Sequence, residues 1–166
     1  MQDLKWLDKY AGQSVEQLVA MKEEYRVDSI VLAFEQALDR KAAREGGQAL
    51  GTEERVIVAV EALEREVNNG GYHQFFVNSS REYAAEIVQA LQSIGCPRTA
   101  EITQRAIDAL GVEDLTDEAI EESIASDDDE RDDKLSECDD SYYGAGEDIA
   151  AQLFAFIATH RDNIKL

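Results

Sequence analysis

Apolar side chains recur along this chain at intervals of three and four residues, the period of amphipathic helices that bury one face. The clearest stripes are Val15, Leu18, Val19; Ile30, Val31, Phe34, Ala37, Leu38; Val56, Val60, Leu63, Val67; Tyr83, Ile87, Val88, Leu91, Ile94; Ile102, Ala106, Ile107, Leu110; Ala119, Ile120, Ile124; and Ile149, Leu153, Phe154, Phe156, Ile157. Alternating Val, Ile and Thr runs, which would indicate strands, are absent. The pattern predicts an all-α fold, in one compact domain of about seven to nine helices.

Capping residues and glycines set the expected helix ends. Ser14 followed by Gln17 forms a capping box, and Asp28, Thr52 and Thr116 are further candidate N-caps. The predicted helices span about 15–25, 28–44, 52–67, 81–94 with Ser79 or Ser80 as cap, 97–110, 116–124 and 149–157, and a charged connector is expected at 126–133. Residues 1–13 have helix-compatible apolar spacing, which fits either a short packed helix or an ordered arm.

The stretch 66–80 interrupts this regular pattern. Asn69, Gly70 and Gly71 are residue types that close a helix at positive φ, so we predict a helix end and a tight corner. Four bulky apolar residues follow within six positions and predict a plug driven into the core: Tyr72, Phe75, Phe76 and Val77. The polar side chains expected to serve the freed backbone groups are Asn68, Asn69, His73, Gln74 and Asn78. We favour a core-building corner over a catalytic or ligand-binding site, since buried polar groups are usually hydrogen-bonded.

The charge of the chain restricts its partners. The 166 residues carry a formal net charge of −20, yet 44% of them are hydrophobic, which is enough for a globular core. Such acidity disfavours direct binding to nucleic acid or anionic membranes and favours basic proteins or cations. Two cysteines, Cys96 and Cys138, form no disulfide framework, and the sequence shows neither a signal peptide nor a membrane-length apolar run. We therefore expect a cytoplasmic protein.

The acidic residues gather in the last third of the chain. Residues 1–112 hold 18 acidic and 12 basic side chains, whereas residues 113–166 hold 18 acidic and 4 basic ones. On a helix, the residues 113, 117 and 121, and likewise 114, 118 and 122, would form two rows of carboxylates roughly 5–6 Å apart. Duplex DNA carries about one phosphate per 3.4 Å on each strand, so such rows could imitate its field. The simpler interpretation is a solvated, solubilising face.

Catalytic and metal-binding patterns are weak. His73 and His160 are the only histidines and belong to no metal-ligand motif, and the run 127–139 fails the calcium-loop pattern because Asp133 and Asp139 stand where glycine and glutamate are needed. We expect no metal, no cofactor and no enzyme activity. An enzyme that uses the polar corner 68–74 remains a third hypothesis.

One stretch carries a family resemblance. Asn-Gly-Gly-Tyr-His-Gln-Phe-Phe-Val-Asn-Ser-Ser at 69–80, together with the looser 135–143, resembles the neisserial DNA-mimic protein family (DMP-nineteen-like), over about 29–163. The resemblance implies an all-α protein that occupies a basic DNA-binding protein, such as a transcriptional regulator or a nucleoid protein.

We therefore predict DNA mimicry, with an acidic interaction or immunity-type module as the alternative, and leave homodimer formation open. The predicted phosphate surrogates are Glu113, Asp114, Asp117, Glu118, Glu121, Glu122, Asp127, Asp128, Asp129, Asp132 and Asp133. The residues assigned to the structural corner are Asn68, Asn69, Gly70, Gly71, Tyr72, Gln74, Phe75 and Phe76.

Overall fold

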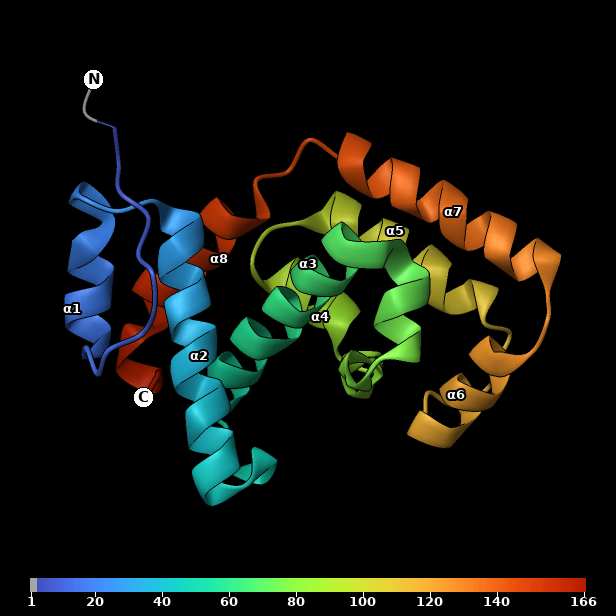
Figure 1. Cartoon of the computed structure of the whole chain (residues 1–166), viewed down its shortest axis with the longest axis horizontal. Helices are drawn as coiled ribbons and strands as arrows, with labels where there is room; N and C mark the ends of the chain where they lie inside the picture. Colours follow the sequence, from blue (N-terminus) through green and yellow to red (C-terminus); the bar gives the residue numbers. More distant parts are fainter. Residues whose placement is uncertain (1–2) are drawn as a thin grey trace. The chain divides into compact units, whose positions relative to one another are not determined.

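A computed structural model describes residues 3–166, which form eight α-helices and no β-strand (Figure 1). The helices are α1 (Val15–Ala20), α2 (Val27–Glu45), α3 (Thr52–Val77), α4 (Ile87–Ser93), α5 (Pro97–Ala109), α6 (Asp117–Ala125), α7 (Asp129–Gly144) and α8 (Ile149–His160). Short 3₁₀-helices cover Met21–Glu23, Gly47–Ala49, Ser79–Tyr83 and Arg161–Asn163. The prediction of an all-α fold with seven to nine helices is confirmed.

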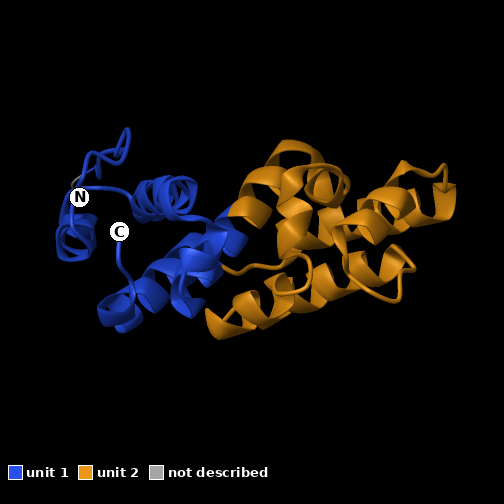
Figure 2. Cartoon of the chain, turned by 90° about the horizontal axis from the view of Figure 1, so that it is seen from below, with its two compact units in different colours: residues 1–61, 148–166 blue, residues 62–147 orange. Residues whose placement is uncertain are grey.

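The chain folds into two compact units (Figure 2). Unit 1 comprises Met1–Glu61 and Asp148–Leu166, and unit 2 comprises Ala62–Glu147. Helix α3 begins in unit 1 and continues into unit 2, because the apolar stripe that starts near Thr52 does not stop at the boundary. The single domain predicted from the sequence thus has an internal division that the helix pattern does not reveal.

Unit 1 is built on the packing of α2 against α8. Leu18, Ile30, Phe34, Leu38, Leu153 and Ile157 are fully buried there, as their stripes predict, and Ile57 is buried beside them. A buried ion pair joins Lys41 to Glu54 at 2.8 Å, and the Lys41 ammonium also donates to the Lys165 carbonyl at 2.8 Å. Because these contacts satisfy the buried ammonium, the unit tolerates a charge in its interior.

The first described residues form an ordered arm, one of the two alternatives left open for 1–13; residues 1–2 lie outside the described part. Lys5 N–H donates to the Glu24 carbonyl and Arg26 N–H donates to the Lys5 carbonyl, each at 2.8 Å. The Arg26 guanidinium lies 5.5 Å from the ring centre of Trp6, a cation–π contact. These contacts bind the arm to the residues that lead into α2, and the arm itself is not helical.

Several predicted helix ends are right and others are wrong. The capping box of Ser14 and Gln17 is present. Thr52 marks the start of α3, but as its first helical residue and not as its N-cap, since the Gly51 carbonyl accepts the Arg55 N–H. The expected cap Asp28 lies inside α2 instead, because Arg26 takes the N-cap position. Asp28 accepts the side chain of Arg26 and the backbone N–H of Ser29.

The helix predicted over 81–94 is wrong in its first half, which is a 3₁₀-helix and a turn before α4. Ser80 does not cap a helix, because its hydroxyl donates to the buried carboxylate of Glu66 at 3.0 Å. Asn78 donates to the other oxygen of Glu66 at 2.9 Å. Both side chains therefore hold the chain against α3 and delay the start of the next helix.

In unit 2, α5 packs against both α4 and α7. Its N-terminus lacks a local side-chain cap, since Cys96 occupies the N-cap position. Glu147, from the segment between α7 and α8, serves instead: its carboxylate accepts the backbone N–H groups of Arg98 and Thr99, each at 2.9 Å, and the Thr99 hydroxyl at 2.7 Å. A negative charge at this position also interacts favourably with the helix dipole.

Candidate partner-binding surface

The negative charge of the chain belongs mainly to unit 2. Unit 2 holds 22 acidic and 6 basic residues, whereas unit 1 holds 14 acidic and 10 basic residues. The asymmetry seen between the two parts of the sequence is thus also an asymmetry between compact units. The eleven carboxylates predicted as phosphate surrogates all lie in unit 2, and all are exposed.

The two long carboxylate rows predicted across 113–122 are not formed. Helix α6 begins only at Asp117, with Thr116 as its side-chain N-cap, so Glu113 and Asp114 precede it. The reason is that Gly111, at φ +66°, follows the end of α5, and the chain needs several residues before the Thr116 cap restarts a helix. Each row is therefore reduced to a pair of carboxylates one helical turn apart.

One of these pairs is occupied by an internal cation. Arg81 binds both carboxylate oxygens of Asp117, at 2.8 and 3.2 Å, and approaches Glu121 at 3.4 Å. It also donates to the Val77 carbonyl at 2.6 Å. The bidentate contact fixes α6 to the segment before α4, and it leaves these two carboxylates partly neutralised.

The predicted connector at 126–133 is shorter than expected. Helix α7 begins at Asp129, and Asp128 is its N-cap, accepting the Arg131 N–H at 3.0 Å. Asp129, Glu130 and Asp132 occupy the first turn, where carboxylates interact favourably with the helix dipole. The acidic run therefore starts a helix, because the same residue types that solvate a loop also cap and stabilise an N-terminus.

A buried arginine fastens the turn between α6 and α7. Arg131 is 4% exposed. Its guanidinium donates to the carbonyls of Ser123 and Ser126 and binds the carboxylate of Asp132 at 2.8 Å. Asp132 is thus an internal counter-ion as well as a surface charge.

The exposed face of α7 presents a continuous row of carboxylates, which we call the α7 row: Asp129, Asp133, Glu137 and Asp140. The spacing of four, four and three residues keeps them on one side of the helix. The opposite side is buried through Leu135, Cys138 and Tyr142. Glu137 and Asp140 are not among the predicted phosphate surrogates, because the sequence predicts a connector at 126–133 and no helix that would place these residues in line with Asp129 and Asp133.

The corner at 68–74 is a kink within α3. Gly70 and Gly71 interrupt the helix, and Gly71 adopts φ +76° and ψ −174°, a conformation almost restricted to glycine. The expected helix stop is therefore real, but the helix resumes at once. Tyr72, Phe75 and Phe76 are fully buried, as the plug requires. Val77 does not belong to it, since 43% of its surface is exposed.

Helix α7 supplies the groups that bind the backbone at the kink. Tyr72 N–H donates to Asp139 Oδ1 at 2.7 Å, and the Tyr143 hydroxyl donates to the Val67 carbonyl at 3.1 Å. The prediction that local polar side chains serve these groups is wrong for Asn68, which donates to the Glu64 carbonyl. It is also wrong for Asn78, which is bound to Glu66 as described above.

The remaining local candidates do not bind the kink through hydrogen bonds: Asn69 and His73 are exposed, and the side chain of Gln74 lies over Gly70. Burial raises the pKa of the Asp139 carboxyl, although the Tyr72 N–H bond acts in the opposite direction. Burial likewise raises the pKa of the Tyr72 hydroxyl, which is hydrogen-bonded to Thr103 Oγ1 at 2.7 Å. The corner is therefore a packed junction around a carboxylate.

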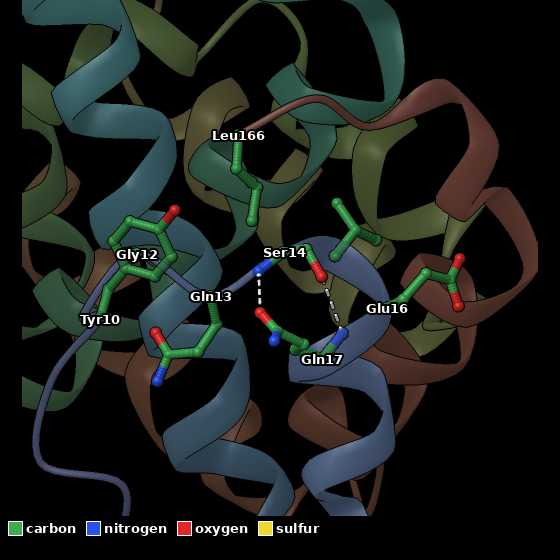
Figure 3. A pocket seen from close by; sticks show the side chains of 8 residues that line it. Tyr10, Gly12, Gln13, Ser14, Glu16, Gln17 and Leu166 are labelled. Atoms are coloured by element: carbon green, nitrogen blue, oxygen red, sulfur yellow. Dashed lines mark hydrogen bonds between the residues drawn. The ribbon is translucent and has the colours of Figure 1, made fainter.

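Two open hollows accompany these features. One, of about 610 Å³, lies beside α6 and is lined by Leu110, Gly111, Val112, Glu113, Asp114, Thr116, Ala119, Glu122, Ser123 and Ser126. The other, of about 450 Å³, lies in unit 1 beside the start of α1 (Figure 3). There Ser14 and Gln17 bond to each other in the capping box, so these groups are already satisfied.

Within residues 3–166, no three His, Cys, Asp or Glu side chains converge as metal ligands would. None of the helices in that range combines the length and apolar character that crossing a membrane requires. A family model described as DMP19-like protein matches residues 48–160 of the chain. A comparison with curated proteins returned no match. The matched range covers the kink, the acidic helices and all of α8.

Proposed function

The chain belongs to the DMP19-like protein family, and from this premise we propose that it is a DNA mimic that binds and sequesters a basic DNA-binding protein. The partner would be a transcriptional regulator or a nucleoid protein whose DNA-binding surface accepts carboxylates in place of phosphates. The observation that carries the proposal is the α7 row, an exposed line of carboxylates on a helix whose other face is buried. We propose binding without catalysis.

The spacing of the α7 row supports this assignment. From Asp129 to Asp140 the helix rises about 16 Å, at 1.5 Å per residue. Four carboxylates over that length compare with about five phosphates on one DNA strand. Because the helix is packed along its buried face, its backbone keeps the spacing of the row on binding, and little backbone entropy is lost.

The other predicted carboxylates divide by their contacts. Asp117 and Glu121 face Arg81, while Asp128 caps α7 and Asp132 pairs with Arg131. These four maintain the shape of the acidic region, so their charge is partly committed within the protein. We assign Glu113, Asp114, Glu118, Glu122 and Asp127 to the flanks of the binding surface, next to the α7 row.

The test is competition with DNA. Purified histone-like nucleoid protein and helix-turn-helix regulators, each bound to its own fluorescent duplex, are titrated with this protein at low and high salt. We expect displacement of duplex from at least one of them, and a steep loss of affinity as salt rises, because the contact is between unlike surface charges.

A variant with the α7 row neutralised (Asp129→Asn, Asp133→Asn, Glu137→Gln, Asp140→Asn) should bind roughly 10- to 100-fold more weakly, from about 0.5 kcal/mol for each of four exposed pairs. It leaves Asp128 and Asp132 in place, so the α7 cap and the Arg131 pair persist.

The matched control removes four exposed carboxylates from unit 1 instead: Asp3→Asn, Asp8→Asn, Glu23→Gln and Glu24→Gln. It changes the net charge of the protein by the same amount but leaves the α7 row intact. Equal weakening by both variants would show that net charge alone acts, and an absence of DNA displacement would refute the mimicry. Binding that DNA does not oppose would favour an acidic interaction module.

A further inference from the structure

We propose that Asp139 and Tyr143 are positioning residues that clamp α7 to the kink of α3 and thereby set the direction of the α7 row. This inference rests on the proposed function for its consequence in binding. The clamp itself is a property of the free protein. Asp139 then has a role inside the protein, whereas the exposed carboxylates of the α7 row face the partner.

The two residues contact the kink from both sides. The Val67 carbonyl and the Tyr72 N–H flank the two non-helical glycines, and they are bound by Tyr143 and Asp139 respectively. Asp139 and Tyr143 are four residues apart, so they project from the same side of α7. Two hydrogen bonds one helical turn apart fix both the position and the rotation of a helix, since each bond is directional.

The kink is shaped to receive the carboxylate. A Cβ on Gly71 would lie 2.7 Å from Cγ of Asp139, closer than real Cβ atoms approach a neighbour. The glycine is therefore required both for its backbone angles and for the room that it leaves. Asp139 is only partly exposed and lies between the buried side of α7 and the α7 row. Its oxygen is used inside unit 2 and not for a partner.

Apolar packing sets the rotation of α7 only coarsely. Leu135, Cys138 and Tyr142 bury one side of α7, and Tyr142 meets the Tyr72 ring edge-on at 6.0 Å. These contacts keep the apolar side of α7 buried but tolerate small rotations, and such rotations would change the direction in which the α7 row points. The clamp selects the rotation that presents the row.

The variants distinguish the role of Asp139 as a hydrogen-bond acceptor from the role of its negative charge. Asp139→Ala removes the acceptor, Asp139→Asn keeps an oxygen acceptor but removes the charge, and Tyr143→Phe removes only the hydroxyl. Asp140→Asn is the matched control, because it removes the same charge from the neighbouring position in the α7 row without touching the kink. Amide hydrogen exchange is measured in each free protein, followed by affinity and its salt dependence with the nucleoid-protein and regulator probes.

In Asp139→Ala we expect the Tyr72 amide to exchange roughly 10- to 100-fold faster, as for a lost bond to a charged acceptor. Tyr143→Phe should raise exchange roughly 2- to 10-fold in the residues around Val67 and in the C-terminal turns of α7, as for a neutral bond. Asp139→Asn should lie between wild type and Asp139→Ala, because the neutral amide oxygen still accepts the Tyr72 N–H but more weakly than a carboxylate does. Asp140→Asn should leave exchange unchanged. Wild-type protection of Tyr72 in Asp139→Ala would overturn the clamp.

In binding, Asp139→Ala should lower affinity with an unchanged salt dependence, and Asp139→Asn should largely restore it. Asp140→Asn should reduce the salt dependence. If Asp139→Asn and Asp139→Ala weaken binding equally and both reduce the salt dependence as Asp140→Asn does, Asp139 is a phosphate surrogate and the positioning role is refuted. If wild type displaces DNA from none of the probes, the proposed function fails, and the exchange data alone decide the clamp.

Discussion

Replacing Gly71 by alanine tests the junction between α3 and α7. The alanine backbone would have to adopt φ +76°, a conformation almost restricted to glycine, which costs roughly 1–3 kcal/mol. Its Cβ would also displace the Asp139 carboxylate from the Tyr72 N–H, at roughly 1.5–3 kcal/mol for a hydrogen bond to a charged group. Together these terms lower the free energy of unfolding by about 2.5–6 kcal/mol, or the thermal midpoint by roughly 5–24 °C at this chain length.

The assay is thermal and urea unfolding followed by circular dichroism, with Gly111→Ala as the control. Gly111 also has positive φ, but nothing lies within 4 Å of a Cβ there, so only backbone strain is expected. In an Asp139→Ala background, Gly71→Ala should cost about as much as strain alone, roughly 1–3 kcal/mol. Equal destabilisation by Gly71→Ala and Gly111→Ala, with no dependence on residue 139, would refute the junction that we describe.

Two further predictions concern the core of unit 2 and its acid sensitivity. Phe75→Ala and Phe76→Ala should each lower the free energy of unfolding by roughly 3–5 kcal/mol in urea titrations, because both rings are fully buried; a loss below 1 kcal/mol would contradict the plug. Burial alone would raise the pKa of Glu147, but the hydrogen bonds from Thr99 and Arg98 outweigh it, so its pKa lies below the usual glutamate value. With the folded pKa below the unfolded one, this stabilisation is complete above about pH 4.3 and is lost as pH falls through the folded pKa. Glu147→Gln should therefore reduce the pH dependence of stability in that acid range, and an unchanged acid profile would disprove it.

Much of the helical architecture follows from local rules. Apolar periodicity predicts seven of the eight described helices and misses α7, whose charged first turns were expected to form a connector. The caps at Ser14 and Thr116 set helix starts that the structure keeps. The error at 81–94 occurs because a distant group replaces a local signal. Glu66 holds Asn78 and Ser80 and so removes the expected cap of the next helix. No spacing rule along the sequence predicts that Glu66 binds Asn78 and Ser80.

The site was predicted less completely than the fold. Composition located the acidic region, and the Gly-Gly pair located the kink. Their contact, however, is made by Asp139 with Tyr72, which are 67 positions apart, and by Tyr143 with Val67, which are 76 positions apart. Both Asp139 and Tyr143 lie in the stretch 135–143, whose family resemblance does not indicate what they contact. In a run this rich in carboxylates, sequence cannot tell a surface charge from one that is bound internally. The structure identifies Asp139 as an internally bound carboxylate, because it accepts a hydrogen bond from the Tyr72 N–H.

Internal arginines decide which acidic helix presents the stronger field. Arg81 neutralises part of α6 through Asp117 and Glu121, and Arg131 binds the first turn of α7 through Asp132. Along the rest of α7 the one ion pair in the described structure is between Lys134 and Glu130, neither of which belongs to the α7 row. Like charges left unpaired along one helix repel one another and act against the compact state. Asp139, Tyr143 and the apolar side of α7 hold the α7 row in place despite this repulsion. Solubility alone does not require such an arrangement, and a partner with the opposite charge would relieve the repulsion.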